Sequence, residues 1–362
     1  MTYHLPKPDY QFYTKNGTIT TGTYNQYPRQ DIIGWRIKFT CDTNFPSSWR
    51  EIWLGEELPK MYKNKADINI MLSGGSDSLT TALGFIECGY DVNHTIVLYK
   101  DYDHICNARE VKEAFKFAGK HRIKYDVIEH NVCDFFDEWV NDPKWHGYST
   151  NIMDSSLQMW SVSKIDQSLF TIISEPGFTG YIKCENDWMY RNVMDNQHTQ
   201  EVFTNLGFNG TTRPYWTSPK ALTAFFAGDV SERILYDNVF NLSPGEMLST
   251  PELKYKAWSM LSGLDVTPYV VPKTSVQMFD KHKWLKKWHK AMADGLINIS
   301  YKNLQLEYSM NDFHKRLKDG SISDYWIDFK DWAVEAPDTW YGPKLDDLHN
   351  NGVQAHYHRQ HL

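Results

Sequence analysis

A serine- and glycine-rich turn that contains one acid is the part of this chain best suited to chemistry. The sequence Ser-Gly-Gly-Ser-Asp-Ser occupies residues 73–78, directly after the apolar run 68–72 and directly before a helical pattern. Where a strand runs through such a turn into a helix, backbone N–H groups converge and the helix dipole favours an anion. Asp77 alone would repel phosphate, but a Mg²⁺ ion can bridge carboxylate and phosphate oxygens. The pattern therefore predicts a site for a magnesium-bound polyphosphate.

Other phosphate-binding motifs do not fit this turn. No Gly-Lys-Ser/Thr follows it, and the chain has no GxGxxG pattern. The turn resembles the SGGxDS signature of the PP-loop ATP pyrophosphatases, with Ser76 in the variable position. That family includes the asparagine, GMP, argininosuccinate and NAD synthetases and several tRNA-modifying enzymes. The resemblance extends over about residues 66–130, and it implies that ATP is split between its α and β phosphates to form an adenylated substrate.

The resemblance also implies roles for individual residues. The ATP phosphates would lie against the turn, whose residues are Ser73, Gly74, Gly75, Ser76, Asp77 and Ser78. Asp77 would act in catalysis and hold Mg²⁺, and the adenine would lie near Leu98 and Tyr99, at the end of the second strand of the family's sheet. The cofactors implied are ATP and Mg²⁺, and the partner implied is a small-molecule acceptor.

Further site residues follow from a looser likeness to the synthetase domain of asparagine synthetase. An acidic loop after the fourth strand of that domain corresponds here to Glu185 and Asp187, which would add metal ligands beside Asp77. Lys254 and Lys273 stand at places like its basic positions and would neutralise the leaving pyrophosphate. The alternative for all four is an ordinary surface role, because exposed acids and solvated lysines are common.

Strand and helix patterns alternate around the turn, which predicts a parallel sheet with helices on both faces. The expected strands after the first are 95–99 and 125–128, and the expected helices are 107–118, stopped by Gly119, and 132–140. Gly89 is expected to end the helix that follows the turn. Residues 155–174 are expected to form one long helix with Leu157, Trp160, Ile165, Leu169 and Ile172 facing inward, before a fourth strand at 181–184.

The chain is expected to divide into three parts. Residues 1–60 look β-rich, with Asn16-Gly17 as a hairpin turn between 10–15 and 18–24 and a further strand at 32–40. Residues 61–194 would form the ATP-binding α/β domain. Residues 195–362 look mainly helical and would supply the acceptor site and close over the ATP.

Composition limits the class of protein. The chain has 362 residues, a net charge of −7 and five cysteines without a CxxC pair. This argues against a broad nucleic-acid surface, a local zinc or iron–sulfur site and a disulfide framework. A Lys- and Trp-rich segment at 281–290 is a local exception, read either as an RNA or polyphosphate contact or as an ordinary surface helix. No apolar stretch approaches the about 20 residues of a membrane span, so a cytoplasmic protein is expected.

Two classes of function remain open from the sequence. The first is an adenylating ligase or amidotransferase-type enzyme that releases AMP and pyrophosphate. Its N-terminal region carries Thr2 where glutamine-dependent relatives have a nucleophilic cysteine, so a separate ammonia or sulfur donor would be needed. The second is a nucleotide-binding module without catalysis. A sulfur-transfer or nucleoside-modifying enzyme, or an adenylyl-sulfate reductase, is a further alternative; a reductase needs a cysteine near its C-terminus, whereas the last one here is Cys184.

Overall fold

The computed structural model of the chain describes about half of its residues. They are 9–14, 19–21, 32–40, 48–65, 67–101, 104–105, 107–142, 153–174, 181–183, 188–190, 203, 206–212, 214–215, 217–227, 258–266, 315–316, 318–321 and 324–329. Among these, no helix is long and apolar enough to cross a membrane.

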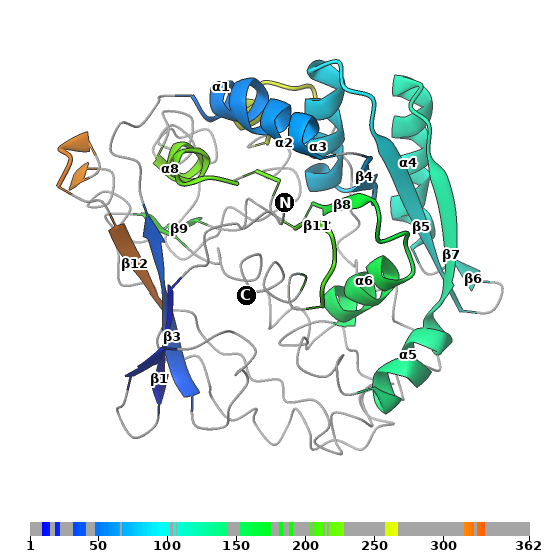
Figure 1. The fold of residues 1–362 in the computed structure, drawn as a ribbon, viewed down its shortest axis with the longest axis horizontal. Coiled ribbons are helices and arrows are strands. Elements are labelled where there is room, and N and C mark those ends of the chain that lie inside the picture. Colours follow the sequence, from blue (N-terminus) through cyan, green and yellow to red (C-terminus); the bar gives the residue numbers. More distant parts are fainter. Residues whose placement is uncertain are drawn as a thin grey trace.

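A parallel sheet forms the centre of the described structure (Figure 1). Its parallel strands are β4 (Ile68–Met71), β5 (Asn93–Asp101), β7 (Asp126–Asn131), β8 (Phe170–Ile173) and β11 (Gly210–Thr211), in the spatial order β11-β8-β4-β5-β7. The short strand β6 (His104–Ile105) pairs antiparallel with the end of β5. This order places the first strand in the middle, as in doubly wound sheets. The predicted parallel α/β fold is confirmed.

Helices connect these strands and cover the sheet. They are α3 (Ser76–Glu87), α4 (Ala108–His121), α5 (Val132–Asn141) and α6 (Met153–Ser163). The chain adds strands on both sides of β4. Because crossovers between parallel strands are right-handed, crossovers that run in the two directions place their helices on opposite faces of the sheet. Gly89 follows α3 with φ +71°, as expected of a helix stop. Gly119 does not stop α4, which continues to His121 and ends because Arg122 adopts the left-handed conformation.

The segment 155–174 is not the single helix that the sequence indicated. Helix α6 ends at Ser163, a turn follows in which Ser168 N–H donates to the Asp166 carboxylate over 2.9 Å, and β8 begins at Phe170. All four residues of β8 are buried, so the strand lacks the alternation that would distinguish it from a buried helix. The predicted fourth strand at 181–184 is also misplaced. Residues 181–183 form β9 (Tyr181–Lys183), which pairs antiparallel with β10 (Trp188–Tyr190) in a separate sheet.

An unbroken helical stretch packs beside α3. It consists of α1 (Trp49–Ile52), the π-helical turn η2 (Trp53–Glu57) and α2 (Leu58–Asn64), so the chain becomes helical before the end of the β-rich stretch expected over 1–60. A second helix, α8 (Pro219–Ala227), packs against α1. Ser218 caps the start of this helix, because Ser218 Oγ accepts a hydrogen bond from Ala221 N–H over 3.1 Å.

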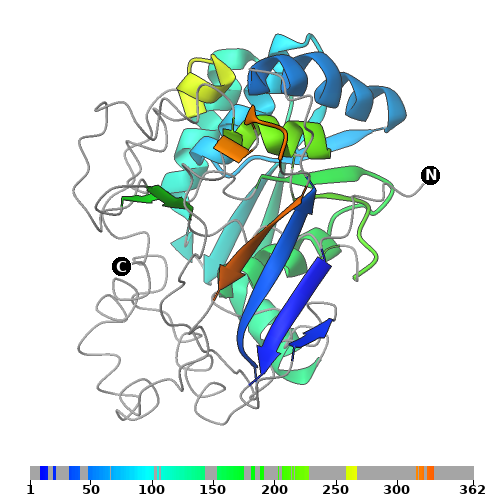
Figure 2. The same cartoon turned by 90° about the vertical axis from the view of Figure 1, so that its left-hand side faces the viewer.

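A second, antiparallel sheet brings together strands from both ends of the chain (Figure 2). It contains β1 (Asp9–Thr14), β2 (Ile19–Thr21), β3 (Ile32–Thr40) and β12 (Asp324–Phe329), in the order β12-β3-β1-β2. The hairpin expected around Asn16-Gly17 is confirmed by the antiparallel pairing of β1 with β2. Strand β12 was not expected, since the C-terminal part of the sequence looked mainly helical.

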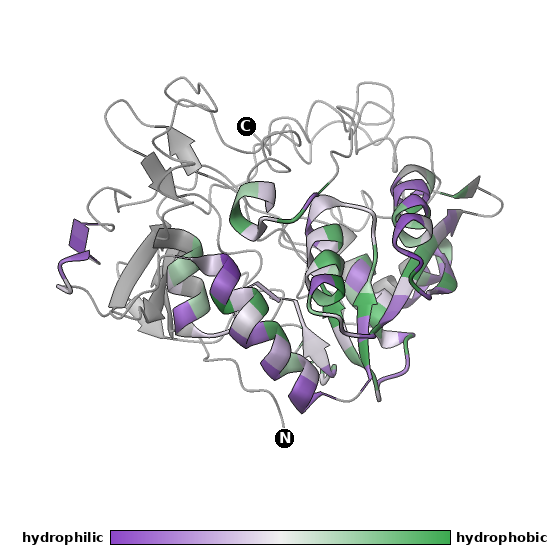
Figure 3. Ribbon diagram, turned by 90° about the horizontal axis from the view of Figure 1, so that it is seen from above, coloured by the Kyte–Doolittle hydropathy of each residue, from purple (hydrophilic) through white to green (hydrophobic). Residues whose placement is uncertain are grey.

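The described core lies between the parallel sheet and its helices. Apolar residues concentrate on the central strands, whereas the helices also carry hydrophilic residues (Figure 3). Ile70, Ile96 and Ile172 on three neighbouring strands have no exposed surface. Buried apolar surface of this kind is the main favourable term in folding, and it fixes β4 and α3 on either side of residues 73–78.

Candidate active site at the phosphate loop

Residues 73–78, called here the phosphate loop, join β4 to α3 as the sequence predicted. The loop lies at the carboxyl end of β4, next to β8, where the strand order reverses direction. Open α/β sheets bind ligands in the crevice at this switch point. The position of the loop is therefore the expected one for a ligand site.

Two glycines in the loop have different tasks. Gly74 has φ +84°, and a Cβ at this position would lie 2.8 Å from the backbone nitrogen of Ala114 in α4, closer than real Cβ atoms come. Gly74 thus lets the loop pack against α4. Gly75 is the N-cap residue of α3, and among the described residues a Cβ there would meet only Ser73 Oγ, at 3.5 Å. Gly75 thus leaves the start of the helix open on that side.

Serine hydroxyls hold the loop in shape from within. Ser73 Oγ and Ser78 Oγ lie 3.0 Å apart, and Ser78 Oγ also donates to the Gly75 carbonyl over 3.0 Å. The N–H of Gly75 donates to Ser73 Oγ over 3.3 Å. These bonds order the turn without a ligand. The first N–H groups of α3 have no acceptor inside the helix, so this end attracts an anion.

Asp77 lies in the first turn of α3 and is only 8 % exposed. One oxygen of its carboxylate, Oδ1, accepts a hydrogen bond from the indole N–H of Trp258 over 2.9 Å. Its backbone carbonyl accepts another from the hydroxyl of Tyr215. A buried carboxylate is tolerated only when polar partners replace the lost water, and the indole that bonds this one comes from 181 residues along the chain. The carboxylate is therefore held in one place by the surrounding structure.

A chain of hydroxyls extends from Asp77 to the end of β8. Tyr215 donates to the Asp77 carbonyl, Thr81 Oγ1 donates to the Tyr215 oxygen over 2.9 Å, and Ser174 Oγ donates to Thr81 Oγ1 over 2.9 Å. A carbonyl can only accept, which fixes the direction of every bond in this hydroxyl chain. The hydroxyl chain ties the first turns of α3, which carry Asp77 and Thr81, to the residue that follows β8.

Aromatic rings pack around the residues that hold Asp77. This aromatic cluster consists of Trp49, Trp53, Tyr215, Phe225 and Trp258. Trp49 and Trp53 stack with their ring centres 4.8 Å apart, and their indole N–H groups donate to the carbonyls of Tyr215 and Pro214 over 2.9 and 2.8 Å. The stacked pair thereby fixes the segment that carries Tyr215.

Burial, and secondly the charge of Asp77, raise the pKa of Tyr215 well above its ordinary value. The phenol therefore keeps its proton at every physiological pH. A protonated phenol is what the Asp77 carbonyl needs as a donor.

The carboxyl ends of β5 and β7 lie at the same edge of the sheet as the phosphate loop, on the side of β4 away from β8. Leu98 is buried there and Tyr99 is half-buried, in register with His130 on β7. The side chain of Asn107 bridges the β5 backbone, accepting from Tyr99 N–H over 2.9 Å and donating to the Val97 carbonyl over 2.8 Å. This side chain occupies the backbone edge beside the adenine position that the family resemblance implied.

His130 is 6 % exposed and lies between Tyr99 and Trp160, with ring centres 6.4 and 5.0 Å away. Its Nε2 has no hydrogen-bond partner among the described residues. Burial, and secondly the charge of Lys164, lower the pKa of His130. The imidazole is therefore neutral at pH 7.

The described residues test only part of the predicted site. Glu185, Asp187, Lys254 and Lys273 lie outside them. The loop residues and Asp77 come together as expected, but the described part of the chain holds no group of three or more acids, histidines or cysteines that would form a metal site by itself. One carboxylate near a phosphate site still fits Mg²⁺, which commonly binds one or two carboxylates together with substrate phosphates.

Sequence reasoning missed the residues that hold the loop from a distance. Trp258 and Tyr215 are 181 and 138 residues away from Asp77. Their aromatic type fits core packing equally well, so nothing local marks them. Thr81 could have been noticed as a polar residue in the apolar pattern of the helix, and Ser174 as the first polar residue after β8.

Comparison with known proteins finds matches in solved structures. No protein-family model and no curated protein matches the chain. NMN synthetase from Francisella tularensis is 11% identical with a TM-score of 0.27, over 62% of this chain and 96% of that one. NH3-dependent NAD synthetase from Campylobacter jejuni is 12% identical with a TM-score of 0.27, over 62% and 100%.

A U34-tRNA thiolase from Methanococcus maripaludis is 13% identical with a TM-score of 0.28, over 75% of this chain and 77% of that one. All three proteins are members of the PP-loop ATP pyrophosphatase superfamily, the family that the loop sequence resembles. Because these TM-scores are low, the chemistry of this chain has to be inferred from its own strand order and phosphate loop.

Proposed function

We propose that the protein is an ATP-dependent adenylating ligase of the PP-loop type, which splits ATP into AMP and pyrophosphate. The observation that carries this proposal is the phosphate loop itself. It is ordered by its own serines, open at Gly75, and placed at the switch point of a doubly wound sheet. The acceptor is a small molecule, and a separate ammonia or sulfur donor supplies the nucleophile.

The loop binds the phosphates through its backbone and hydroxyls. Ser73 and Ser78 lie next to the first turn of α3, where N–H groups and hydroxyls together favour a polyphosphate. Ser76 belongs to the same turn. The adenine lies near Leu98 and Tyr99, beside the β5 backbone that Asn107 engages.

Asp77 is the residue that would hold Mg²⁺, which supplies charge neutralisation for the phosphates when it is bound. The sequence adds Glu185 and Asp187 as further candidate ligands and Lys254 and Lys273 as candidate partners for the leaving pyrophosphate. An oxygen of the acceptor attacks the α-phosphorus, the bond to the β-phosphate oxygen breaks, and pyrophosphate leaves with the bonding electrons. The donated nitrogen or sulfur nucleophile then attacks the acceptor carbon that bears the adenylated oxygen, and AMP leaves with that oxygen. The backbone N–H groups of the loop stabilise the charge that develops on it.

The observed fourth strand adds a carboxylate to this proposal. Glu185 and Asp187 were expected as ligands because an acidic loop follows the fourth strand. The fourth strand of the parallel sheet is β8, and the acid that follows it in the sequence is Glu175. We therefore expect Glu175→Gln to impair ATP cleavage more than Glu185→Gln or Asp187→Asn, measured as the initial rate of pyrophosphate release.

Product analysis tests the proposal directly. ATP labelled at the α or the γ position is incubated with Mg²⁺, the purified protein and a mixture of candidate carboxylate and nucleoside acceptors. We expect AMP and pyrophosphate, with the activity lost in Asp77→Ala. ADP and orthophosphate as the main products would contradict the assignment.

Gly75→Ala is a sharper probe of the phosphate contact. Within the part of the chain that the structure describes, a Cβ at Gly75 meets only Ser73 Oγ at 3.5 Å, so the variant should fold normally. The same Cβ would lie on the open side of the loop, where a phosphate approaches, so ATP binding should weaken at least tenfold. Unchanged ATP affinity in a folded Gly75→Ala protein would remove the loop as the phosphate site.

A nucleotide-binding module without catalysis is the second candidate. The observation in its favour is that Asp77 is 8 % exposed and bonded to Trp258, which is close confinement for a metal ligand. Tight ATP binding without turnover of any acceptor would establish this function in place of the ligase.

A further inference from the structure

We propose that Trp258 is a positioning residue for Asp77, by which a remote part of the chain sets the response of the ATP site to Mg²⁺. This inference rests on the proposed function, since it concerns the same carboxylate. Asp77 lies in the phosphate loop, whereas Trp258 begins a helical turn of residues 258–262 that follows the described part of the ATP-binding domain by many residues.

The contact is direct and sheltered. Trp258 Nε1 donates to Asp77 Oδ1 over 2.9 Å, and the indole has no exposed surface. Its ring centre lies 4.3 Å from Tyr215 and 5.9 Å from Phe225. Tyr215 meanwhile donates to the Asp77 carbonyl, so one residue fixes the backbone of Asp77 and the other fixes its carboxylate.

A hydrogen bond to one carboxylate oxygen determines how the group faces the loop. An aspartate side chain otherwise samples several rotamers, each of which presents its oxygens differently. With Oδ1 bonded to an immobile indole, the carboxylate keeps one orientation. Mg²⁺ demands near-ideal geometry from its ligands, so a fixed orientation affects its binding more than that of a bare phosphate.

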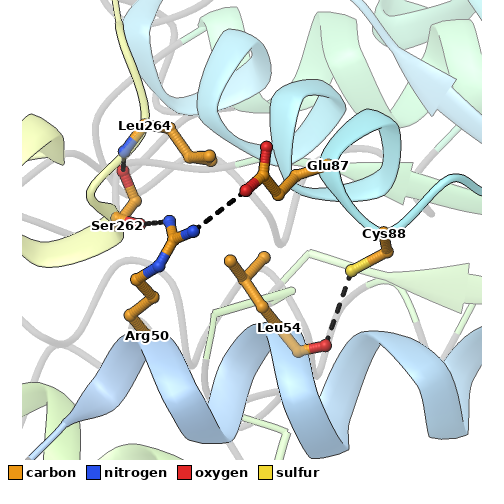
Figure 4. A network of polar contacts seen from close by, with 6 residues as sticks. All are labelled: Arg50, Leu54, Glu87, Cys88, Ser262 and Leu264. Carbon is orange, nitrogen blue, oxygen red and sulfur yellow. Dashed lines mark hydrogen bonds and ion pairs between the residues drawn. The ribbon is translucent and has the colours of Figure 1, made fainter.

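The helical turn that carries Trp258 is in turn held by the Arg50 latch, which consists of the contacts of Arg50 with Ser262 and Glu87 (Figure 4). Arg50 on α1 donates through Nη1 to the carbonyl of Ser262, and through Nη2 to Glu87 on α3 over 3.0 Å. Ser262 Oγ donates to the Trp258 carbonyl over 2.7 Å and accepts from Leu264 N–H over 3.1 Å. The Arg50 latch therefore connects the helical turn with Trp258 to both α1 and the end of α3.

The test measures ATP affinity by calorimetry, with Mg²⁺ and with EDTA, in the full-length protein. The quantity of interest is the dissociation constant of ATP in EDTA divided by that in Mg²⁺. This ratio reports how much Mg²⁺ strengthens ATP binding. Trp258→Phe keeps a buried ring but removes the N–H donor. We expect this ratio to fall about tenfold in the variant, as when a hydrogen bond to a charged group is lost, with little change in metal-free ATP binding.

Two latch variants separate positioning from general packing. Arg50→Gln loses the charged donor to Ser262 and the ion pair, whereas Glu87→Gln loses only the ion pair. We expect a several-fold fall of the ratio in Arg50→Gln and none in Glu87→Gln. Arg50 is partly exposed, so its variant keeps the test available if Trp258→Phe does not fold.

The outcomes are distinguishable from a failure of the proposed function. If the wild-type protein binds no ATP, the proposed function fails. If the wild type binds Mg-ATP and the variants keep its ratio while only their melting temperatures fall, Trp258 is a packing residue and the inference is overturned. A higher ratio in Trp258→Phe would also overturn it, because the indole would then obstruct the carboxylate.

Discussion

At the phosphate-loop end of the sheet's carboxyl edge, side chains from more than a hundred residues away hold Asp77, whereas at the β5–β7 end the partners come from nearer in the sequence. Asp77 is bonded to Trp258 and Tyr215, 181 and 138 residues away. Tyr99 N–H donates to Asn107, eight residues away, the Tyr99 hydroxyl accepts from Ser161, 62 residues away, and His130 keeps an unpartnered Nε2 among the described residues. The loop end therefore depends on the folding of the whole chain, and the β5–β7 end retains unused hydrogen-bonding capacity.

The largest loss of stability should come from placing a methyl group in the contact between the phosphate loop and α4. In Gly74→Ala, the new Cβ meets the backbone of α4 and the residue must adopt φ +84°. Backbone strain and overpacking together should lower the free energy of unfolding by about 3 kcal/mol or more. Chemical denaturation of the variant would measure this loss.

Gly119→Ala is the matched control, because it adds the same methyl group to α4 at a place where no other atom of the described residues lies within 4 Å. It should be neutral or slightly stabilising, since alanine is the better helix former. Equal losses in the two variants would mean that the loop does not depend on its contact with α4.

Breaking the hydroxyl chain should have the next largest effect. Tyr215→Phe keeps the ring in the aromatic cluster but leaves Thr81 Oγ1 without its acceptor and the Asp77 carbonyl without this donor. Leaving buried polar groups unpaired should cost about 1–3 kcal/mol of stability. Denaturation of Tyr215→Phe beside Ser174→Ala measures it; Ser174 is partly exposed, so its loss should be smaller. A larger loss in Ser174→Ala would contradict this account of the chain.

This contrast also explains how far sequence reasoning reached. The turn 73–78 was predictable because its strand, glycines, acid and helix are consecutive, and the strands β5 and β7 because turns and helices separate them clearly. The strand β8 was not, since Phe170–Ile173 is apolar on both faces and shows no period of two. The misreading placed the fourth strand of the sheet at 181–184, and the acidic loop was therefore expected at Glu185 and Asp187.

The partners of Asp77 could not be predicted at all. Trp258 is one of 14 tryptophans, and nothing in its neighbours distinguishes an indole that bonds a carboxylate from one that only fills the core. Such a contact between distant segments depends on tertiary packing, which a single sequence does not display. The local bridge of Asn107 to β5 is different, because a short-range side chain that bonds nearby backbone is typical of asparagine.

At the β5–β7 end, the titration of His130 should affect stability. Burial lowers its folded-state pKa below the ordinary 6.5, so below that pH the unfolded chain binds more protons than the native state. The stability that His130 contributes is therefore complete above pH 6.5 and is lost as the pH falls through its folded-state pKa. Urea unfolding of the wild type and of His130→Gln between pH 5 and 8 measures the difference.

His121 is the comparison residue, since burial lowers its pKa too but it is more exposed and lies at the end of α4. His121→Gln should remove less of the pH dependence than His130→Gln. If His130→Gln unfolds with the same pH dependence as the wild type, the imidazole is not kept neutral by burial.

The smallest expected effect is the pH dependence of stability caused by Glu57, near the phosphate-loop end. Its sign is opposite to that of His130. Glu57 is 5 % exposed, its Oε1 accepts from Ser218 Oγ over 2.9 Å, and burial raises its pKa above the ordinary 4.5. Between pH 4.5 and the raised value, the native state binds more protons than the unfolded chain, so stability falls as the pH rises through this window. Glu57→Gln stays neutral and should flatten this part of the profile, by about 1 kcal/mol or less in the free energy of unfolding at pH 7.

Ser218→Ala provides the control for this last effect. The hydrogen bond from Ser218 favours the charged carboxylate and lowers the pKa of Glu57, so its removal should extend the window of falling stability to higher pH. The same variant loses the N-cap of α8, so its pH slope, and not its absolute stability, is the quantity to compare. If Glu57→Gln and the wild type show equal slopes from pH 4 to 7, burial does not hold the Glu57 proton. The pH dependence of folding would then come from the β5–β7 end, where His130 is buried.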